Sequence, residues 1–205
     1  AKSYKKNAKR LYNTVNRLEE TKNLYVDRDI LEFGHGLGDF IIEAQKYANS
    51  AQGVEVRDED IQHVRAQGLE SKKSILEYSE NSLDIVFLFH VFEHLTSPLD
   101  TLKNIHSRLK QASSTIYIEV PHAKDFLLST AKLNEFKEFT LWSDHLILHT
   151  RESLTRFLQE AGFNEISISG IQRYPLSNHL SWLLTKKPTG RNGPLSFLDS
   201  EEINI

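Results

Sequence analysis

The stretch Ile30–Phe40, ILEFGHGLGDF, decides how the chain folds. Its first four residues are mostly apolar, and a short run of this kind is typical of a buried strand. The residues that follow, Phe40–Tyr47, have the spacing of a helix. Three glycines separate the two patterns: Gly34, Gly36 and Gly38. Because glycine allows a tight turn and a close approach of the backbone to a ligand, the stretch predicts a ligand-binding turn between a strand and a helix.

Two acids accompany this turn. Glu32 stands two residues before the first glycine, and Glu55 ends the next predicted strand, Gln52–Val56. An acid about 20 residues after a glycine-rich turn suits the two hydroxyl groups of a ribose. The dinucleotide-binding fingerprint would need a further glycine where Asp39 stands, so the usual pyrophosphate loop is not expected.

Short apolar runs alternate with helical stretches over the rest of the chain. The most apolar run is Leu83–Phe89, and a helix is expected from Ser97-Pro98 to Leu109, with the serine as its cap. A second helix is expected from its cap Thr150 to Ala161. Further strands are expected at 74–76, 115–120 and 163–171. This alternation predicts an α/β fold with a mostly parallel sheet and helices on both of its faces.

Residues 3–22 form a separate N-terminal pattern. Apolar side chains recur there at helical spacing, which predicts an amphipathic helix. The expected packed side consists of Tyr4, Ala8, Leu11, Tyr12, Val15 and Leu18. The expected solvated side carries Lys5, Lys6, Lys9 and Arg10.

Composition excludes several classes of function. The chain of 205 residues contains no cysteine, which excludes disulfides, thiolate–metal sites and a catalytic cysteine. A net charge of −3 gives no overall field that favours nucleic acid. No apolar run approaches the length of a membrane span, and the N-terminus lacks the apolar region of a secretory signal. We expect a soluble cytoplasmic protein without a nucleic-acid partner; the sequence leaves its oligomeric state open.

The turn and the segments after it resemble the class I S-adenosylmethionine-dependent methyltransferases. Glu32–Gly38 is similar to their E/D-x-G-x-G-x-G motif, and Glu55 matches their ribose-binding acid. Three later segments also resemble family motifs: Ser82–Val86, His90–Pro98 and Ile116–Pro121. The resemblance covers about residues 28–172 and implies a Rossmann-like fold of the seven-stranded type. It implies a cofactor site built from Glu32, Gly34, His35, Gly36, Gly38, Glu55, Phe89 and His90, and no metal.

The segment His90–His94, HVFEH, has a second interpretation. It also matches H-x-x-E-H, an inverted zinc-peptidase motif. Zinc would need both histidines on one helical face, Glu93 as the base and a third ligand further on. Because the motif starts at the end of a buried strand, we expect His90 to border the methionine part of the cofactor instead.

A long connection between residues 120 and 151 predicts a substrate-binding insertion. It is longer than a simple connection requires, and it is rich in aromatic residues and histidines. Its run Trp142–Leu146, WSDHL, resembles a segment of deoxysugar C-methyltransferases, in which the histidine and its acidic neighbour lie at the reacting carbon. The resemblance makes His145 the candidate base, with Asp144 beside it and His122 in reserve.

These observations lead to one expected function with alternatives. We expect methyl transfer from S-adenosylmethionine to a small molecule, by O-methylation of a sugar or sugar nucleotide in a surface-polysaccharide or deoxysugar pathway. Trp142 replaces the tyrosine of the C-methyltransferases, so C-methylation ranks second. The alternatives of another class are a non-catalytic cofactor-binding module and the zinc peptidase.

The expected organisation is one methyltransferase domain over residues 1–205. It has an N-terminal helix in 1–25, a cofactor-binding core in 28–120, the substrate-binding insertion in 121–149 and a C-terminal part in 150–205. The family ends on an antiparallel strand beside the one expected at 163–171. After Pro175 only a helix around Asn178–Leu184 is expected, followed by loop, so that last strand is not expected from residues 172–205.

Overall fold

The computed structural model describes residues 8–110, 113–141, 145–189 and 193–199. It divides into two compact units. The first unit comprises Ala1–Val120 and Phe157–Phe163, and the second comprises Pro121–Arg156 and Asn164–Ile205. The division into functional segments stays a prediction.

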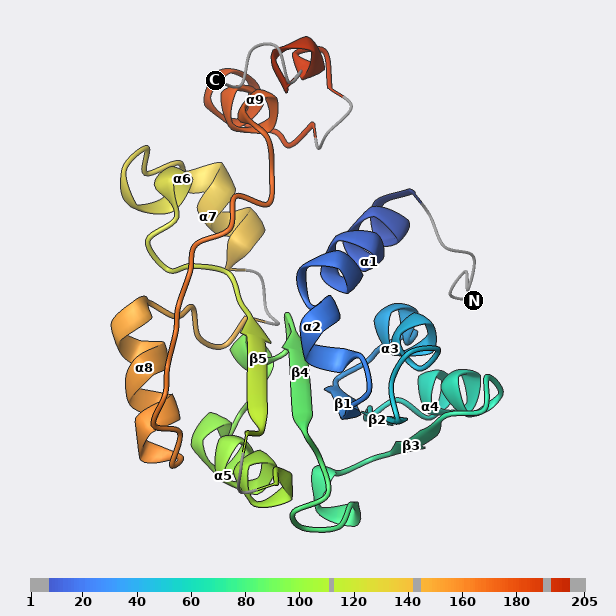
Figure 1. Cartoon of the computed structure of the whole chain (residues 1–205). Coiled ribbons are helices and arrows are strands. Elements are labelled where there is room, and N and C mark those ends of the chain that lie inside the picture. The colour runs from blue at the N-terminus through green and yellow to red at the C-terminus, as the bar shows by residue number, and fades with distance from the viewer. Residues whose placement is uncertain (1–7, 111–112, 142–144, 190–192, 200–205) are drawn as a thin grey trace. The chain divides into compact units, whose positions relative to one another are not determined.

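The first unit is built on a parallel sheet of five strands (Figure 1). The strands are β1 (Asp29–Phe33), β2 (Ser50–Val54), β3 (Glu70–Lys72), β4 (Ile85–Phe89) and β5 (Thr115–Glu119). Their order is β3-β2-β1-β4-β5, and every neighbouring pair is parallel. The predicted α/β class is therefore confirmed. Because the order reverses between β1 and β4, the carboxyl ends of these two strands form the crevice where α/β sheets bind ligands.

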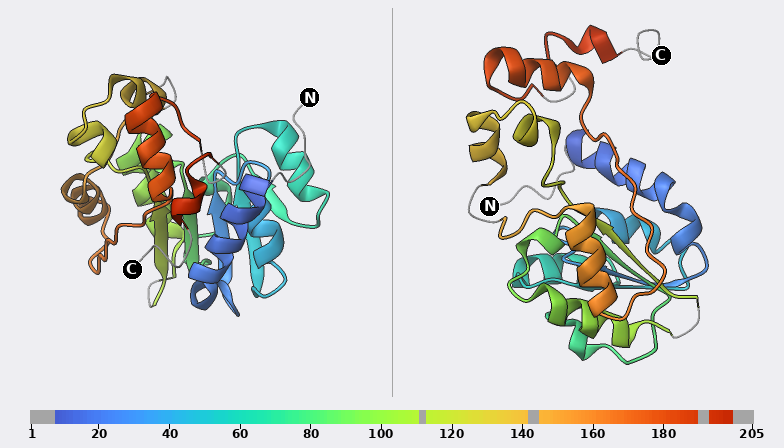
Figure 2. Two further views of the ribbon diagram at one scale, coloured as in Figure 1. Left: turned by 90° about the horizontal axis from the view of Figure 1, so that it is seen from above. Right: turned by 90° about the vertical axis from the view of Figure 1, so that its left-hand side faces the viewer.

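Helices cover both faces of this sheet (Figure 2). They are α1 (Ala8–Glu20), α2 (Lys22–Tyr25), α3 (Asp39–Ala44), α4 (Asp58–Arg65) and α5 (Pro98–Arg108). On one face, Phe40 of α3 lies 4.9 Å, between ring centroids, from both Phe87 and Phe89 of β4. The alternate residues of β4, Val86 and Leu88, point to the other face and are fully buried.

The prediction of a strand at residues 74–76 is wrong. Residues Ile75–Glu77 form a 3-10 turn, η1, and the strand β3 lies five residues earlier at Glu70–Lys72. The Ser74 hydroxyl accepts a hydrogen bond from the Leu76 amide, and the Glu77 side chain accepts one from the Ser74 amide. This reciprocal capping favours a helical turn over a strand. β3 was missed because its short sequence, ESK, has no apolar pattern.

The strand expected at 163–171 is also wrong. These residues form no regular secondary structure. A strand needs a neighbour to satisfy its backbone groups, and residues 172–189 and 193–199 contain a helix and a 3-10 turn but no strand. The guanidinium of Arg151 donates instead to the Ile168 carbonyl. Of the seven strands of the family type, the described residues therefore form five.

Three residues of the expected packed side of the N-terminal helix are exposed, whereas Leu18 packs against the core as expected. Leu11, Tyr12 and Val15 are 50%, 40% and 41% exposed, whereas Thr14 is buried. Arg10 is half-buried and pairs with Asp39 at the start of α3. The apolar spacing predicted the helix correctly but the burial of these three residues wrongly, because polar partners for the arginine side lie far away in the sequence.

The second unit is mostly helical in its described part. It contains α6 (Phe126–Ser129), α7 (Asn134–Thr140), α9 (Leu176–Thr185) and the 3-10 turn η3 (Ser196–Asp199), and it shares α8 (Arg151–Glu160) with the first unit. Leu127, Leu133 and Trp182 form its core. Thr150 caps α8 as predicted, because its hydroxyl accepts from the Ser153 amide at 3.2 Å. Across the described ranges, no helix has both the length and the apolarity to cross a membrane.

The turn between β1 and α3 is expected to tolerate no side chain at Gly38. Gly38 has φ +73°, and a Cβ there would lie 2.5 Å from Cγ2 of Val64 on α4. Gly38→Ala should therefore combine backbone strain of about 1–2 kcal/mol with overpacking of about 1–3 kcal/mol. Gly68 is the matched control, since it has φ +85° but open space around its Cβ position. Urea unfolding should show a clearly larger loss for Gly38→Ala; equal losses in the two variants would contradict the packing argument.

Candidate functional site

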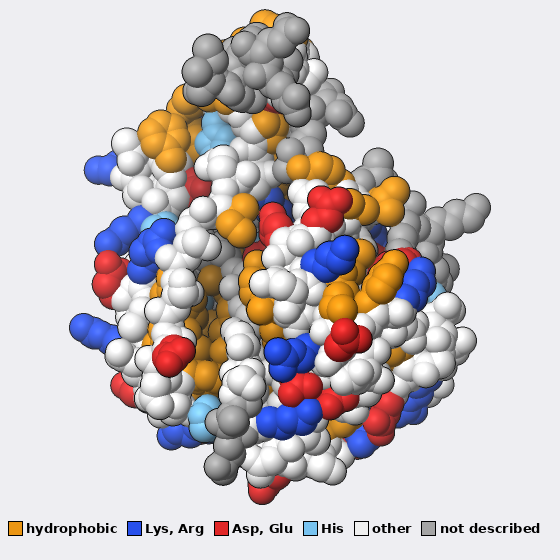
Figure 3. Space-filling model, viewed as in Figure 1, with side chains coloured by type: hydrophobic (Ala, Val, Ile, Leu, Met, Phe, Trp, Pro, Cys, Tyr) orange, Lys and Arg blue, Asp and Glu red, His pale blue; other side chains and the backbone are white. Residues whose placement is uncertain are grey.

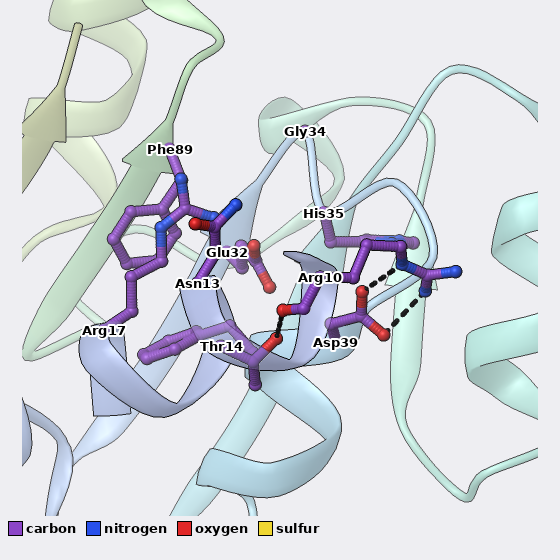
Figure 4. Close-up of a pocket in the computed structure, with 10 residues that line it drawn as sticks. Arg10, Asn13, Thr14, Arg17, Glu32, Gly34, His35, Asp39 and Phe89 are labelled. Atoms are coloured by element: carbon purple, nitrogen blue, oxygen red, sulfur yellow. Dashed lines mark hydrogen bonds and ion pairs between the residues drawn. The ribbon is translucent and has the colours of Figure 1, made fainter. Parts of the chain in front are cut away.

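A cavity of about 140 Å³ opens at the carboxyl ends of β1 and β4 (Figure 4). The sheet side of its wall includes Glu32, Gly34 and Phe89, and α1 closes the opposite side with Arg10, Asn13, Thr14 and Arg17. Small-molecule pockets usually measure roughly 300–1,000 Å³. The enclosed part is therefore smaller than a whole ligand of the size of S-adenosylmethionine.

Glu32 is the buried acid of this cavity. Its side chain is 5% exposed, and one carboxyl oxygen accepts a hydrogen bond from the Ile41 amide of α3 at 3.2 Å. Burial raises the pKa of Glu32 to about 8, although the nearby Arg17 guanidinium and the Ile41 amide act in the opposite direction. A carboxyl group with this environment is stabilised as an anion by any cation that enters the cavity.

The glycine turn is tied to the end of β2. The amides of Gly34 and His35 both donate to the Val54 carbonyl, at 2.7 and 3.2 Å. Gly34 has φ +73°, and a Cβ there would lie 2.5 Å from Cγ2 of Val91. At Gly36 a Cβ would meet no atom within 4 Å. The turn is thus packed on one side and open at Gly36, where a ligand can approach the backbone.

Glu55 follows β2 directly and holds the turn in place. One carboxylate oxygen accepts from the Gly36 amide at 2.9 Å, and the other accepts from the amides of Val56 and Arg57 at 2.8 and 3.1 Å. The carboxylate is thereby fixed beside the open glycine. The neighbouring Val56 is 75% exposed, so apolar surface lies next to the acid.

His35 points into the protein, although its ring also contributes to the cavity wall. Its Nδ1 donates to the Gly36 carbonyl at 2.9 Å, and the Ser71 hydroxyl of β3 donates to its Nε2 at 2.7 Å. Burial lowers the pKa of His35, which favours this neutral ring. A Cβ at Gly53 would lie 2.4 Å from the imidazole Cδ2. His35 therefore braces the turn against β2 and β3, and a direct contact with the cofactor stays a prediction.

His90 lies between two acids at the end of β4. Its Nε2 is 2.7 Å from Oε1 of Glu119 and its Nδ1 is 3.3 Å from Oε1 of Glu93. Its φ of +55° places it in the left-handed region, and Phe92–His94 form a single 3-10 turn, η2. The α-helical turn that a zinc-binding H-x-x-E-H motif requires is therefore not formed.

Glu119 joins this end of the sheet to α1. It accepts hydrogen bonds from the Arg17 guanidinium at 2.9 and 3.1 Å as well as facing His90. Burial by itself would raise the pKa of Glu119, but the hydrogen bonds from His90 and Arg17 outweigh burial and lower it. Glu119 was missed in the sequence, although it ends a strand just as Glu32 and Glu55 lie at strand ends. Nothing in the local sequence points to Arg17.

The candidate catalytic residues belong to the second unit. Nδ1 of His145 lies 2.6 Å from the Thr140 carbonyl, and the side chain is half-buried. His122 is exposed, and its backbone forms an isolated parallel β-bridge with His149. Asp144 lies outside the described residues. The structure thus brings the predicted cofactor residues together around one turn and two strand ends, while the catalytic assignments stay predictions.

Known structures share this fold. The chain is similar to an S-adenosylmethionine-dependent methyltransferase from Archaeoglobus fulgidus, with a TM-score of 0.67 and 21% identity over 94% of this chain and 87% of that chain. It is also similar to a possible histamine N-methyltransferase from Thermotoga maritima, with a TM-score of 0.59 and 21% identity over 74% and 72% of the two chains. A third is phosphoethanolamine N-methyltransferase 2 from Haemonchus contortus in complex with S-adenosyl-L-methionine, with a TM-score of 0.56 and 18% identity over 74% and 36%.

The sequence itself identifies the family. A comparison with curated proteins gave no match. Residues 4–168, well over half of the chain, match the family described as a methyltransferase domain. This range includes the glycine turn, both predicted cofactor acids and the end of β4. The chain therefore belongs to the methyltransferase domain family, and it is an enzyme that uses S-adenosylmethionine.

Proposed function

We propose that the enzyme methylates a small molecule at oxygen, with a sugar or sugar nucleotide as the acceptor. The observation that carries the cofactor part of this proposal is the cavity at the carboxyl ends of β1 and β4, with the buried Glu32 in its wall. The sugar part rests on the resemblance of the WSDHL run at Trp142–Leu146 to deoxysugar methyltransferases. C-methylation is the alternative outcome.

The residues of the first unit fit the cofactor by their chemistry. S-adenosylmethionine has an ammonium group and a carboxylate at one end and an adenosine at the other. Glu32 is suited to the ammonium group, and Glu55, fixed beside Gly36, is suited to the ribose hydroxyls. Phe89 is the last residue of β4, and His90 follows it directly. Gly34, His35 and Gly38 give the turn its shape.

The chain's contribution to the reaction is mainly placement. When bound, the cofactor supplies a sulfonium methyl group that is already activated. Holding an acceptor in line with such a group can account for roughly 7–11 kcal/mol of the barrier. We assign removal of the acceptor's proton to His145, with Asp144 beside it and His122 as the reserve candidate; such a base contributes about 10²–10⁴-fold.

The descriptions of two similar structures broaden the choice of acceptor to be tested. The Thermotoga protein is described as a possible histamine N-methyltransferase, and the Haemonchus protein as a phosphoethanolamine N-methyltransferase. At 21% and 18% identity these likenesses show the fold alone. A screen for the acceptor should therefore include small amines beside nucleotide sugars, and methylated amines as the only products would contradict the proposed sugar acceptor.

Cofactor binding is the first prediction of this proposal. Calorimetry should show micromolar affinity for S-adenosylmethionine and S-adenosylhomocysteine. Glu55→Ala should weaken both by about 10-fold or more, since the ribose hydroxyls lose a charged acceptor. Glu59→Ala, an exposed acid in the first turn of α4, is the control and should bind normally. If well-folded wild-type protein gave no heat of binding with either ligand, the placement of the cofactor in this cavity would be wrong.

Turnover tests the proposed base. His145→Ala should lower the rate with the true acceptor about 100-fold or more while leaving cofactor affinity nearly unchanged. His122→Ala is the parallel variant and should retain most of the activity. Near-normal turnover of His145→Ala would refute this role.

The raised pKa of Glu32 predicts how stability depends on pH without the cofactor. Between pH 4.5, the ordinary pKa of this group, and about 8, its folded-state pKa, the folded protein binds more protons than the unfolded chain. Stability from this group therefore falls as pH rises through that window. Glu32→Gln should be more stable than wild type at pH 8 and about equally stable at pH 5, as measured by urea unfolding. A difference between the two proteins that does not change with pH would contradict the assignment.

A further inference from the structure

The orientation of α1 requires an explanation. A surface helix normally turns its apolar side inward, but α1 exposes Leu11, Tyr12 and Val15. Figure 3 shows apolar side chains at the surface over this helix. Its inward side carries Arg10, Asn13, Thr14 and Arg17, which line the cavity at the ends of β1 and β4. Polar residues at this helical spacing on the enclosed side indicate a polar ligand beneath the helix.

The two arginines of this side have different environments. Arg10 makes a bidentate ion pair with Asp39, with N–O distances of 2.6 and 2.7 Å, that engages both carboxylate oxygens. This pair joins α1 to the start of α3 and accounts for Arg10 as an anchor of the helix. Its contacts require no ligand.

Arg17 lies at the strand ends. It hydrogen-bonds Glu119 through Nε and one Nη, which uses two of the five N–H groups of a guanidinium. Its Cζ lies 4.3 Å from the centre of the Phe89 ring. Figure 4 shows Arg17 and Glu32 at the same cavity. The cavity therefore contains a cation from α1 and a buried acid from β1.

A guanidinium and a carboxyl group at one cavity match the two ends of a zwitterion. An α-amino acid presents an ammonium group and a carboxylate on one carbon, and the proposed placement puts the amino-acid end of the cofactor in this cavity. A guanidinium is the preferred partner of a carboxylate because its N–H groups match both oxygens. We propose that Arg17 binds the carboxylate at the amino-acid end of the cofactor, opposite Glu32, which takes the ammonium group.

Glu119 then has a defined part. It accepts two hydrogen bonds from the Arg17 guanidinium and so fixes this long side chain at the cavity. Preorganisation of this kind reduces the cost of ordering a long side chain on binding. Because Glu119 also faces His90, the cofactor's carboxylate and the end of β4 are linked through a single acid.

Two ligands that differ at one end test this proposal, which rests on the proposed placement of the cofactor. S-adenosylhomocysteine carries the amino-acid end, and 5′-methylthioadenosine lacks it but keeps the adenosine and the sulfur. Calorimetry with Arg17→Gln should show about 10- to 100-fold weaker binding of S-adenosylhomocysteine. Binding of 5′-methylthioadenosine should change less than about 2-fold, because its contacts remain.

Arg108→Gln is the matched control, since it removes an arginine–acid pair, with Glu80, whose members do not line the cavity. It should affect the two ligands equally, whatever the size of the effect. Arg17→Lys keeps the charge but not the planar pair of N–H donors. It should weaken the binding of S-adenosylhomocysteine by an intermediate amount and leave 5′-methylthioadenosine nearly unaffected. The same variant tests the proposal if Arg17→Gln does not fold. An equal effect of Arg17 substitution on both ligands, or none, would overturn the carboxylate role. Failure of wild-type protein to bind either ligand would overturn the placement of the cofactor itself.

Discussion

The burial of one carboxyl group, Glu32 at the end of β1, is the constraint on which the rest of the site depends. A buried acid is costly unless it is hydrogen-bonded or receives a cation, and here the first turn of α3 supplies one amide. That helix can begin so close to the strand only because a glycine turn separates them. The strand order, with β1 and β4 adjacent, places the acid where two carboxyl ends form a crevice. Fold and site are thus consequences of the same local arrangement.

The second acid, Glu55, shows how the turn is kept in shape. Its three hydrogen bonds from backbone amides tie the glycine turn to the end of β2, while the His35 imidazole ties the same turn to Ser71 on β3. All of these bonds join groups of the protein itself. A turn held on two sides presents an open glycine in a fixed position, which favours binding without a large loss of backbone entropy.

Features encoded by contiguous residues were predictable from the sequence. The glycine turn, the apolar β4 and the threonine cap of α8 are all where local patterns place them. The errors concern partners. Residues 163–171 alternate like a strand but have no neighbour in the described residues, and β3 has a neighbour but no apolar pattern. Leu11, Tyr12 and Val15 of α1 were wrongly expected to be packed, because no local signal shows that Arg17 contacts Glu119, 102 residues away.

Whether Glu32 receives the cofactor's ammonium group can be tested by the number of protons exchanged when S-adenosylhomocysteine binds at pH 7. It is measured by calorimetry in two buffers of different ionisation enthalpy. Burial raises the pKa of Glu32 to about 8 in the free protein, so the group is mostly protonated there, and an ammonium group beside it lowers that pKa. We expect wild type to release close to one proton and Glu32→Gln to release almost none. Tight binding with the same proton exchange in both proteins would contradict this role of Glu32.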